Sequence, residues 1–435
     1  MRILPNSLLA CITFASCVLL SLSSEDGEDG VDEILQQIDV MVEWLIDEDG
    51  SMDPRIEIRR SNPKDHNSRI GIFVKEAIQA DELLIEIPGE IKIQLDDIPK
   101  KEESDDGSND DDDDSSDDDN DEDEDEDNKV SKDYQNHICK LAWALRDEYD
   151  EEEESDYYPY IKYLQFLQPT LRQLPAMFST AGQHLLLQTQ RDTDIRTLTG
   201  FEEPNDMVMW PWRVYEEDCI QDEEDEGNSL SPYFLAMAVQ HGFEHAFIPF
   251  YDLVMHHSMK AKINVFTKPS IFGEQDFGIY ALRDLEPGEE LFRSYRDCND
   301  CHTDRGYSLG TPEMLRDYGF VEPYPHTFHF VGDITVFVDD MGDGKYVARC
   351  VNDKFPLKRV VEARIGDLTE VIEYMVQTSE AIVEKYEYET IKEYHKALVV
   401  ALTTVLPHCV NDDPAGVSAA PKLGESSEAD KRDEL

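Results

Sequence analysis

The stretch 249-PFYDLVMHHSMKAKIN-264 sets two adjacent histidines between an aspartate and an asparagine. These residue types serve as catalytic groups, as metal ligands or as polar parts of a packed loop. A metal site would use His256 and His257 together with the nearby His241 and His245. Adjacent histidines point in different directions on most backbones, and no carboxylate or thiolate spacing completes a tetrahedral set. We therefore predict no metal here, and binding or packing stays open.

A second pattern with chemical potential is 298-CNDCH-302. It is compatible with half a zinc site, a redox pair or a haem attachment. The sequence has no second C-x-x-C, no thioredoxin-like pattern around this one and no further haem signal, so we favour a local disulfide or a loop constraint. The cysteines after residue 24 are Cys139, Cys219, Cys298, Cys301, Cys350 and Cys409, and their pairing cannot be read from sequence.

The elements that position these residues follow from hydrophobic periodicity. A helical period over 31–50 stops at Gly50, and helical spacing recurs over 133–149 and most of 157–243. Short β-branched segments predict strands at 55–60, 70–76, 83–88, 262–267, 277–285 and 290–295. We also expect a helix around 311–320, a hairpin around 328–351 with MGDG as its turn, and two helices between Leu368 and Leu406.

A chain of 435 residues is long enough for a main domain and a smaller helical one. Composition and the predicted elements divide it into seven parts. We predict a signal peptide (1–24), a helix followed by strands (31–100), a disordered acidic insertion (101–130), a mostly helical stretch (131–243), a second stretch with strands (244–325), a hairpin with helices (326–407) and a polar tail (408–435).

Charge limits the classes of partner. The chain has 97 acidic and 39 basic residues, a formal net charge of −58. Between Glu102 and Asp127 there is no Lys, Arg or apolar residue, so nothing offsets the entropy of ordering. Repulsion disfavours nucleic acid and anionic membranes as partners. We interpret the run as a solvating spacer, with loose calcium binding or recruitment of basic substrates as alternatives.

Both ends of the chain resemble targeting signals. The apolar stretch after Arg2 has signal-peptide length and ends in small residues near Ser23 and Ser24, which favours cleavage over an uncleaved anchor. After cleavage no segment is apolar for long enough to span a membrane. The chain ends in 432-RDEL-435, one residue from known retrieval signals. We predict the lumen of the endoplasmic reticulum, with secretion or another compartment on that route as alternatives.

Taken in order, several motifs resemble the SET-domain protein lysine methyltransferases. They are EWL in the first helix, RIGIF, IPFYDLVMHH, ALRDLEPGEELFRSY and LRDYGFVE. The likeness runs from about Val31 to Leu406 and is greatest for the branch of the Rubisco large-subunit and ribosomal-protein lysine methyltransferases. It implies an α+β fold with a β-rich SET core and a pseudoknot, in which the chain end passes beside residues 251–257. A helical insertion and a helical C-terminal domain that binds the protein substrate complete this expectation.

The resemblance also implies a reaction, the transfer of a methyl group from S-adenosyl-L-methionine to a lysine of another protein. A lysine amine must arrive neutral and in line with the methyl group, so the site needs an apolar channel and a separate cofactor pocket. Tyr295 matches the family's catalytic tyrosine, and Tyr318 and Phe320 match the aromatic pair of the lysine channel. Gly71 matches the second glycine of a cofactor-binding G-x-G, whose first glycine is replaced by Arg69.

Other positions depart from the family pattern. We align Asp252 and His257 with the family's D-x-x-N-H, which leaves His256 in the place of the asparagine that holds the cofactor. His241 stands where the family has an arginine for the cofactor's carboxylate, and Arg296 follows Tyr295 where a glycine is usual. The alternative hypothesis is therefore an inactive SET-fold binding protein whose acidic segments bind basic partners or calcium.

Overall fold

The computed structural model describes residues 32–65, 68–95, 126–190, 206–219, 230–243, 246–269, 276–296, 309–330, 334–351, 358–378 and 383–409. The signal peptide, nearly all of the acidic run, CNDCH and the RDEL tail lie outside these ranges. Within them, no helix combines the length and the apolar character that crossing a bilayer requires.

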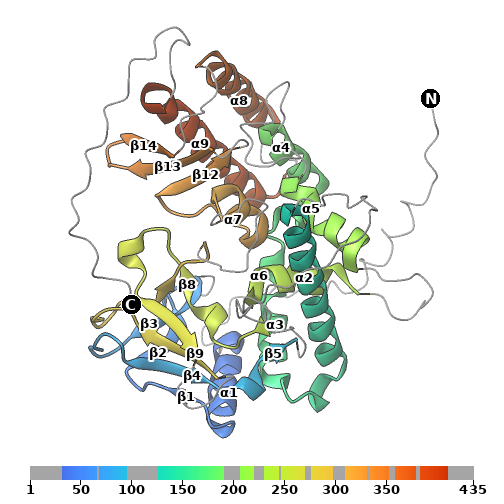
Figure 1. The fold of residues 1–435 in the computed structure, drawn as a ribbon, viewed down its shortest axis with the longest axis vertical. Coiled ribbons are helices and arrows are strands. Elements are labelled where there is room, and N and C mark those ends of the chain that lie inside the picture. The colour runs from blue at the N-terminus through green and yellow to red at the C-terminus, as the bar shows by residue number, and fades with distance from the viewer. Residues whose placement is uncertain are drawn as a thin grey trace, which may run out of the picture.

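Short strands from both halves of the sequence form a region of small sheets (Figure 1). They are β1 (Ser51–Met52), β2 (Ile56–Arg60), β3 (Ile70–Val74), β4 (Leu83–Ile87), β5 (Ile93–Gln94), β6 (Gly242–Phe243), β7 (Ala246–Phe247), β8 (Met255–His256), β9 (Val265–Pro269), β10 (Phe277–Ala281) and β11 (Phe292–Arg293). The sheet orders are β1-β4-β10-β9, β2-β3, β5-β7-β6 and β11-β8. The predicted strands are confirmed, and β4 pairs with β10 across the whole helical insertion.

The strand β11 passes beside β8 as the one parallel pair described, so the crossing expected of the pseudoknot is made by residues 292–293 and not by the chain end. Side chains and backbone fix it from two sides. The amide of Asn264 donates to the Glu290 carbonyl at 2.8 Å, and its oxygen accepts from the Phe292 N–H at 2.7 Å. The Leu291 N–H donates to the Ile72 carbonyl at 2.8 Å. Asn264 is thus a structural residue that holds the β11 segment in place.

The helices of the N-terminal part and of the insertion pack only in part on these sheets. They are α1 (Glu33–Asp47), α2 (Glu126–Asp150), α3 (Tyr158–Leu171), α4 (Thr180–Gln190), α5 (Asp206–Val214) and α6 (Pro232–His241). The α1, α2, α3 and α6 helices share one hydrophobic core with the strands. Cys139 of α2 forms a disulfide with Cys219, at the end of the π-helical turn that follows α5. This bond settles one pairing that the sequence left open.

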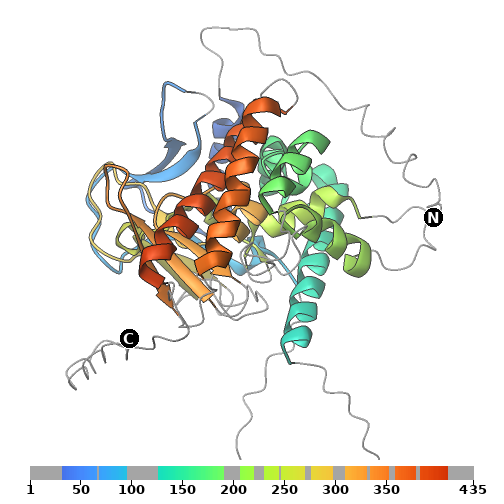
Figure 2. The same cartoon turned by 90° about the horizontal axis from the view of Figure 1, so that it is seen from above.

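The predicted helical insertion is divided between two cores. Leu185 and Leu186 of α4 and Met207 and Val208 of α5 pack with the C-terminal residues, not with the sheets. Figure 2 shows α4 beside the long C-terminal helices. The insertion therefore joins the strand-rich core to the C-terminal domain.

The C-terminal domain consists of α7 (Thr311–Tyr318), β12 (His326–Phe330), β13 (Ile334–Asp340), β14 (Tyr346–Val351), α8 (Lys358–Thr378) and α9 (Lys385–Cys409). The predicted hairpin is correct only for β13 and β14, because β12 adds a third antiparallel strand. The turn expected from MGDG is present, with positive φ at Gly342, Asp343 and Gly344. The first of the two predicted helices begins ten residues earlier than Leu368, at Lys358.

Candidate active site

Tyr295 lies directly after β11, where the parallel pair brings it beside β8. Its side chain is buried, and its hydroxyl donates to the Val254 carbonyl at 3.1 Å. Its backbone N–H donates to Nδ1 of His256 at 3.0 Å. Burial raises the pKa of the Tyr295 phenol, so it stays protonated at neutral pH. The pseudoknot thereby fixes both the backbone and the phenol of the predicted catalytic residue.

The structure brings the two predicted channel aromatics next to Tyr295. Its ring centroid lies 4.8 Å from that of Tyr318, and the Tyr318 and Phe320 centroids are 6.4 Å apart. Leu309 and Met314 pack against the same group and are buried. The N–H group of the Gln240 amide reaches the Tyr318 carbonyl at 3.5 Å, which links α6 to this wall. Tyr295, Tyr318 and Phe320 therefore form one aromatic cluster, as the sequence predicted.

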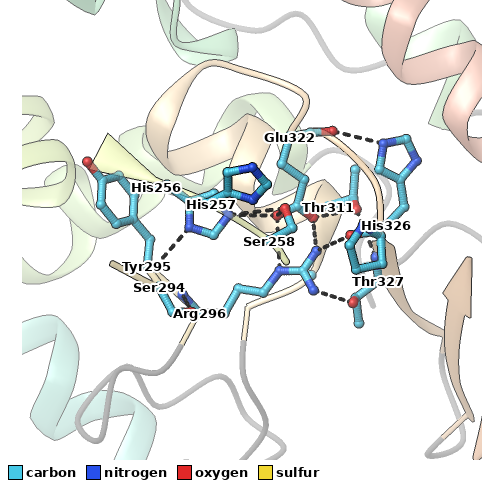
Figure 3. A network of polar contacts seen from close by, with 12 residues as sticks. His256, His257, Ser258, Ser294, Tyr295, Arg296, Thr311, Glu322, His326 and Thr327 are labelled. Atoms are coloured by element: carbon cyan, nitrogen blue, oxygen red, sulfur yellow. Dashed lines mark hydrogen bonds and ion pairs between the residues drawn. The ribbon is translucent and has the colours of Figure 1, made fainter. Parts of the chain in front are cut away.

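His256 belongs to a buried polar network centred on Glu322 (Figure 3). Nε2 of His256 lies 3.0 Å from Glu322 Oε2, and the Ser258 hydroxyl donates to the same oxygen at 2.9 Å. Arg296 makes a two-pronged ion pair with Glu322, with Nε at 3.0 Å from Oε2. The Thr311 hydroxyl donates to Oε1 at 2.8 Å. Glu322 is 1% exposed, so all of its acceptor capacity is met by the protein.

The proton positions in this network follow from its donors. Nδ1 of His256 accepts from the Tyr295 N–H, so the ring proton lies on Nε2 and faces Glu322. Burial lowers the pKa of His256 against the opposing effect of Glu322, which keeps the ring neutral at pH 7. Burial would raise the pKa of Glu322, but the His256 hydrogen bond and the Arg296 charge lower it to about 2. Arg296 and Glu322 are thus a charged pair, bridged to Tyr295 by a neutral imidazole.

Both ring nitrogens of His256 are therefore engaged inside the protein. The ring has no nitrogen left for a cofactor, contrary to our expectation for this position. Counted from Asp252, the spacing D-x-x-N-H falls on Met255 and His256, one residue earlier than our alignment. His257 lies further out, with Nδ1 accepting the Met259 N–H at 3.0 Å and its backbone N–H donating to the Arg293 carbonyl at 3.0 Å.

Arg69 and Gly71 lie beside Glu290, two residues before β11. Arg69 pairs with the Glu290 carboxylate through two nitrogens, Nη2 to Oε2 at 2.7 Å. The Arg69 side chain is 47% exposed and that of Glu290 only 10%. A Cβ on Gly71 would meet Glu290 Oε1 at 2.5 Å, so the glycine is what lets the carboxylate approach β3. Arg69 is held outward by this pair and does not fill the space beside Gly71.

A comparison with models of known protein families matches the SET domain over residues 69–296, just over half of the chain. The protein belongs to the SET domain family. Among solved structures, the SET domain of LSMT bound to lysine and AdoHcy has a TM-score of 0.45 and 11% identity, covering 86% of this chain and 90% of that one. The same domain bound to methyllysine and AdoHcy has a TM-score of 0.44 and 11% identity, covering 85% and 90%. No curated protein sequence matches significantly.

The matched SET domain ends at Arg296, but the site does not. Tyr318, Phe320 and Glu322 lie beyond it, on and after α7, and they complete the aromatic wall and the buried network. The C-terminal domain is therefore part of the site.

Several buried polar atoms near Tyr295 have no hydrogen-bond partner among the described residues. They are Oε1 of Gln240, Nε2 of His241, Oδ1 of Asp252 and Nε of Arg293. His241 Nδ1 lies 3.5 Å from Asp252 Oδ2, to which the Tyr160 hydroxyl donates at 3.4 Å. Buried polar atoms without partners are uncommon and often mark a ligand or water site. No group of three or more His, Cys, Asp or Glu suited to a metal occurs in the described part of the chain.

Sequence reasoning missed Arg293 and Glu322. Arg293 stacks on Tyr251 and Tyr295, with its guanidinium carbon 3.9 and 4.2 Å from the two ring centroids. A cation two residues before the predicted catalytic tyrosine was a signal available in the string FRSY. Glu322 was visible as the last residue of YGFVE, but its partners His256 and Arg296 are 66 and 26 residues away.

Proposed function

We propose that this SET domain protein transfers a methyl group from S-adenosyl-L-methionine to the side-chain amine of a lysine in another protein. The observation that carries the proposal is the setting of Tyr295, whose hydroxyl is fixed on the Val254 carbonyl and whose ring packs against Tyr318. An oriented phenol beside an aromatic wall is what alignment of a neutral amine requires. Membership of the SET domain family supports the same reaction.

In this reaction Tyr295, Tyr318 and Phe320 would have different roles. Tyr295 remains a protonated phenol whose O–H donates to the Val254 carbonyl, so its oxygen can accept a hydrogen bond from an amine N–H. Tyr318 and Phe320 would line the path of the lysine and exclude water from it. When bound, the cofactor supplies a methyl group on a positively charged sulfur, so no strong base is needed beyond a route for proton loss.

The cofactor fits the polar groups around the site in part. The unpartnered Oδ1 of Asp252 would favour its cationic groups, whereas Arg69 and the Glu290 carboxylate beside Gly71 are paired with each other and would have to separate to bind it. His241 would contribute its unpartnered Nε2. His257 would contribute through its backbone, and His256 would act only by holding Tyr295. We read Met255, which cannot donate a hydrogen bond from its side chain, in the place of the family's asparagine.

The reaction is tested by transfer of an isotopically labelled methyl group to proteins of a microsomal extract, with the labelled lysines found by mass spectrometry. Tyr295→Phe should lower the transfer rate at least about 100-fold, because the amine loses its orienting oxygen. Tyr280→Phe is the matched control, since Tyr280 is a buried tyrosine of β10 away from this cluster. Unchanged transfer by the Tyr295 variant would refute the assignment.

A second candidate function is a SET-fold binding protein without methyl transfer. Two observations favour it, namely that both nitrogens of His256 are engaged and that Met255 offers no hydrogen bond to a cofactor. Calorimetric titration with S-adenosylmethionine separates the two functions, because the binding protein would give no heat of binding.

We place the protein in the lumen of the endoplasmic reticulum. The supports are the apolar N-terminal stretch, the RDEL terminus and the disulfide between Cys139 and Cys219, a bond that persists in oxidising compartments. Reaction of Cys139 and Cys219 with a thiol reagent in protein taken from intact cells would contradict this placement.

A further inference from the structure

The positively charged side chain of Arg293 lies among aromatic rings next to Tyr295. It is the last residue of β11, and its guanidinium carbon lies 3.9 Å from the Tyr251 centroid, 4.2 Å from that of Tyr295 and 5.6 Å from that of Phe243. Aromatic faces attract a guanidinium through their quadrupole, so this stacking holds the cation without a carboxylate.

No acidic side chain among the described residues makes an ion pair with Arg293, and its Nε is buried without a hydrogen-bond partner. The other arginines of the site behave differently, since Arg296 is paired with Glu322 and Arg69 with Glu290. Aromatic rings stabilise a cation but do not cancel its charge. Arg293 therefore directs a positive charge at the face of the Tyr295 ring, which the buried Asp252 carboxylate opposes only in part because it is not paired with Arg293.

A second cation that enters this cluster meets repulsion that the partly buried surroundings screen weakly. Two cations belong to the proposed reaction, the lysine ammonium and the cofactor sulfonium. A cationic neighbour also lowers the pKa of an amine, which favours the free base that the transfer requires. Arg293 would therefore act on the charge of the reactants without touching the transferred group.

We propose that Arg293 makes the methyl-transfer site selective for uncharged groups, so that the acceptor lysine binds as the free amine and the cofactor binds more tightly as its neutral thioether product than as its sulfonium. The inference rests on the proposed function. The lysine gives its proton to solvent before the amine enters. The amine nitrogen then bonds to the methyl carbon as the carbon–sulfur bond breaks, with the electron pair left on sulfur. The methylated ammonium returns to solvent.

The test is a pair of calorimetric titrations of the full mature protein, with S-adenosylmethionine and with S-adenosylhomocysteine, at one pH and salt concentration. The quantity of interest is the ratio of the two Kd values, since a purely structural loss changes both alike. Arg293→Met should shift this ratio toward S-adenosylmethionine by roughly tenfold. Arg293→Lys, which keeps the charge, should leave the ratio within about twofold. Arg349→Met is the matched control, because Arg349 stacks on Phe337 at 4.5 Å in the C-terminal sheet.

Binding of both ligands by Arg293→Met with an unchanged ratio would overturn this inference and leave the methyltransferase intact. Binding of neither ligand by any of the proteins would overturn both. Arg293→Gln, a polar neutral replacement, supplies the same comparison if the methionine variant does not fold, and thermal melts of each variant identify that case.

Discussion

Replacement of Glu322 by glutamine tests whether the buried polar network around Glu322 holds the C-terminal domain to the parallel β8–β11 pair. Glu322 follows α7 and is the shared partner of Arg296, His256, Ser258 and Thr311. The substitution keeps the shape of the side chain but removes its charge. It leaves the Arg296 guanidinium, itself 9% exposed, without a counter-ion.

The magnitude follows from the pKa of Glu322, which lies at about 2 in the folded protein against an ordinary value of 4.5. A lowered pKa contributes stability that is fully present above about pH 4.5 and is lost as the pH falls toward 2. The difference corresponds to about 3 kcal/mol. Glu322→Gln should therefore be less stable than the unmodified protein by about 3 kcal/mol at pH 7, in the range for removing one partner of a buried ion pair.

Urea unfolding at several pH values between 7 and 3 measures the effect. Other carboxylates titrate in both proteins, so the quantity to follow is the difference between the two, which should shrink as the pH falls. Glu82→Gln is the control, because Glu82 pairs with Arg55 at a site where its side chain is 33% exposed. An exposed pair of that kind contributes about 1 kcal/mol or less. If the Glu322→Gln difference were the same at pH 3 and pH 7, the charged network would be refuted.

Three further results are expected. Met255→Asn should tighten S-adenosylmethionine binding by roughly tenfold, the value of one good polar contact, and an unchanged Kd in calorimetry would contradict our reading of the D-x-x-N-H spacing. His256→Asn should not tighten it and should lower the free energy of unfolding by about 2 to 3 kcal/mol, because it disturbs the bonds to Tyr295 and Glu322; tighter binding without a stability loss would contradict the network. Cys139→Ser should lower the free energy of unfolding by about 4 kcal/mol in urea, since the disulfide closes a separation of 80 residues, and should have no effect in reductant.

The parts of the fold that were predictable are those set by local patterns. The β-branched segments at Ile70 and Leu83 became β3 and β4, and the 31–50 period became α1, because one-sided burial selects these periods directly. The family resemblance implied that Tyr318 and Phe320 line a channel beside Tyr295, and the three rings do lie together.

The parts that were not predictable depend on contacts far apart in sequence. Periodicity identified helices over 157–243, but it carries no information on which core each apolar face joins. Leu186 of α4 and Val208 of α5 therefore pack against the C-terminal residues, whereas Leu235 of α6 packs in the SET core. The strand β12 was missed as a third strand because its pairing with β13 is set by register, not by a turn signal of its own.

His256 and Arg296, which our first alignment counted as departures from the family pattern, form a single unit. Both side chains converge on Glu322, and His256 passes the connection on to the Tyr295 N–H. Counted separately, His256 suggested a loss in the cofactor pocket and Arg296 a departure beside the catalytic tyrosine. Taken together, they describe a buried ion pair that fixes the backbone of Tyr295 against the C-terminal domain. Because Arg69 is held outward by Glu290, the departures that still weigh against catalysis are Met255 and His241, and the proposed effect of the Arg293 charge bears on the same question of what this site can bind.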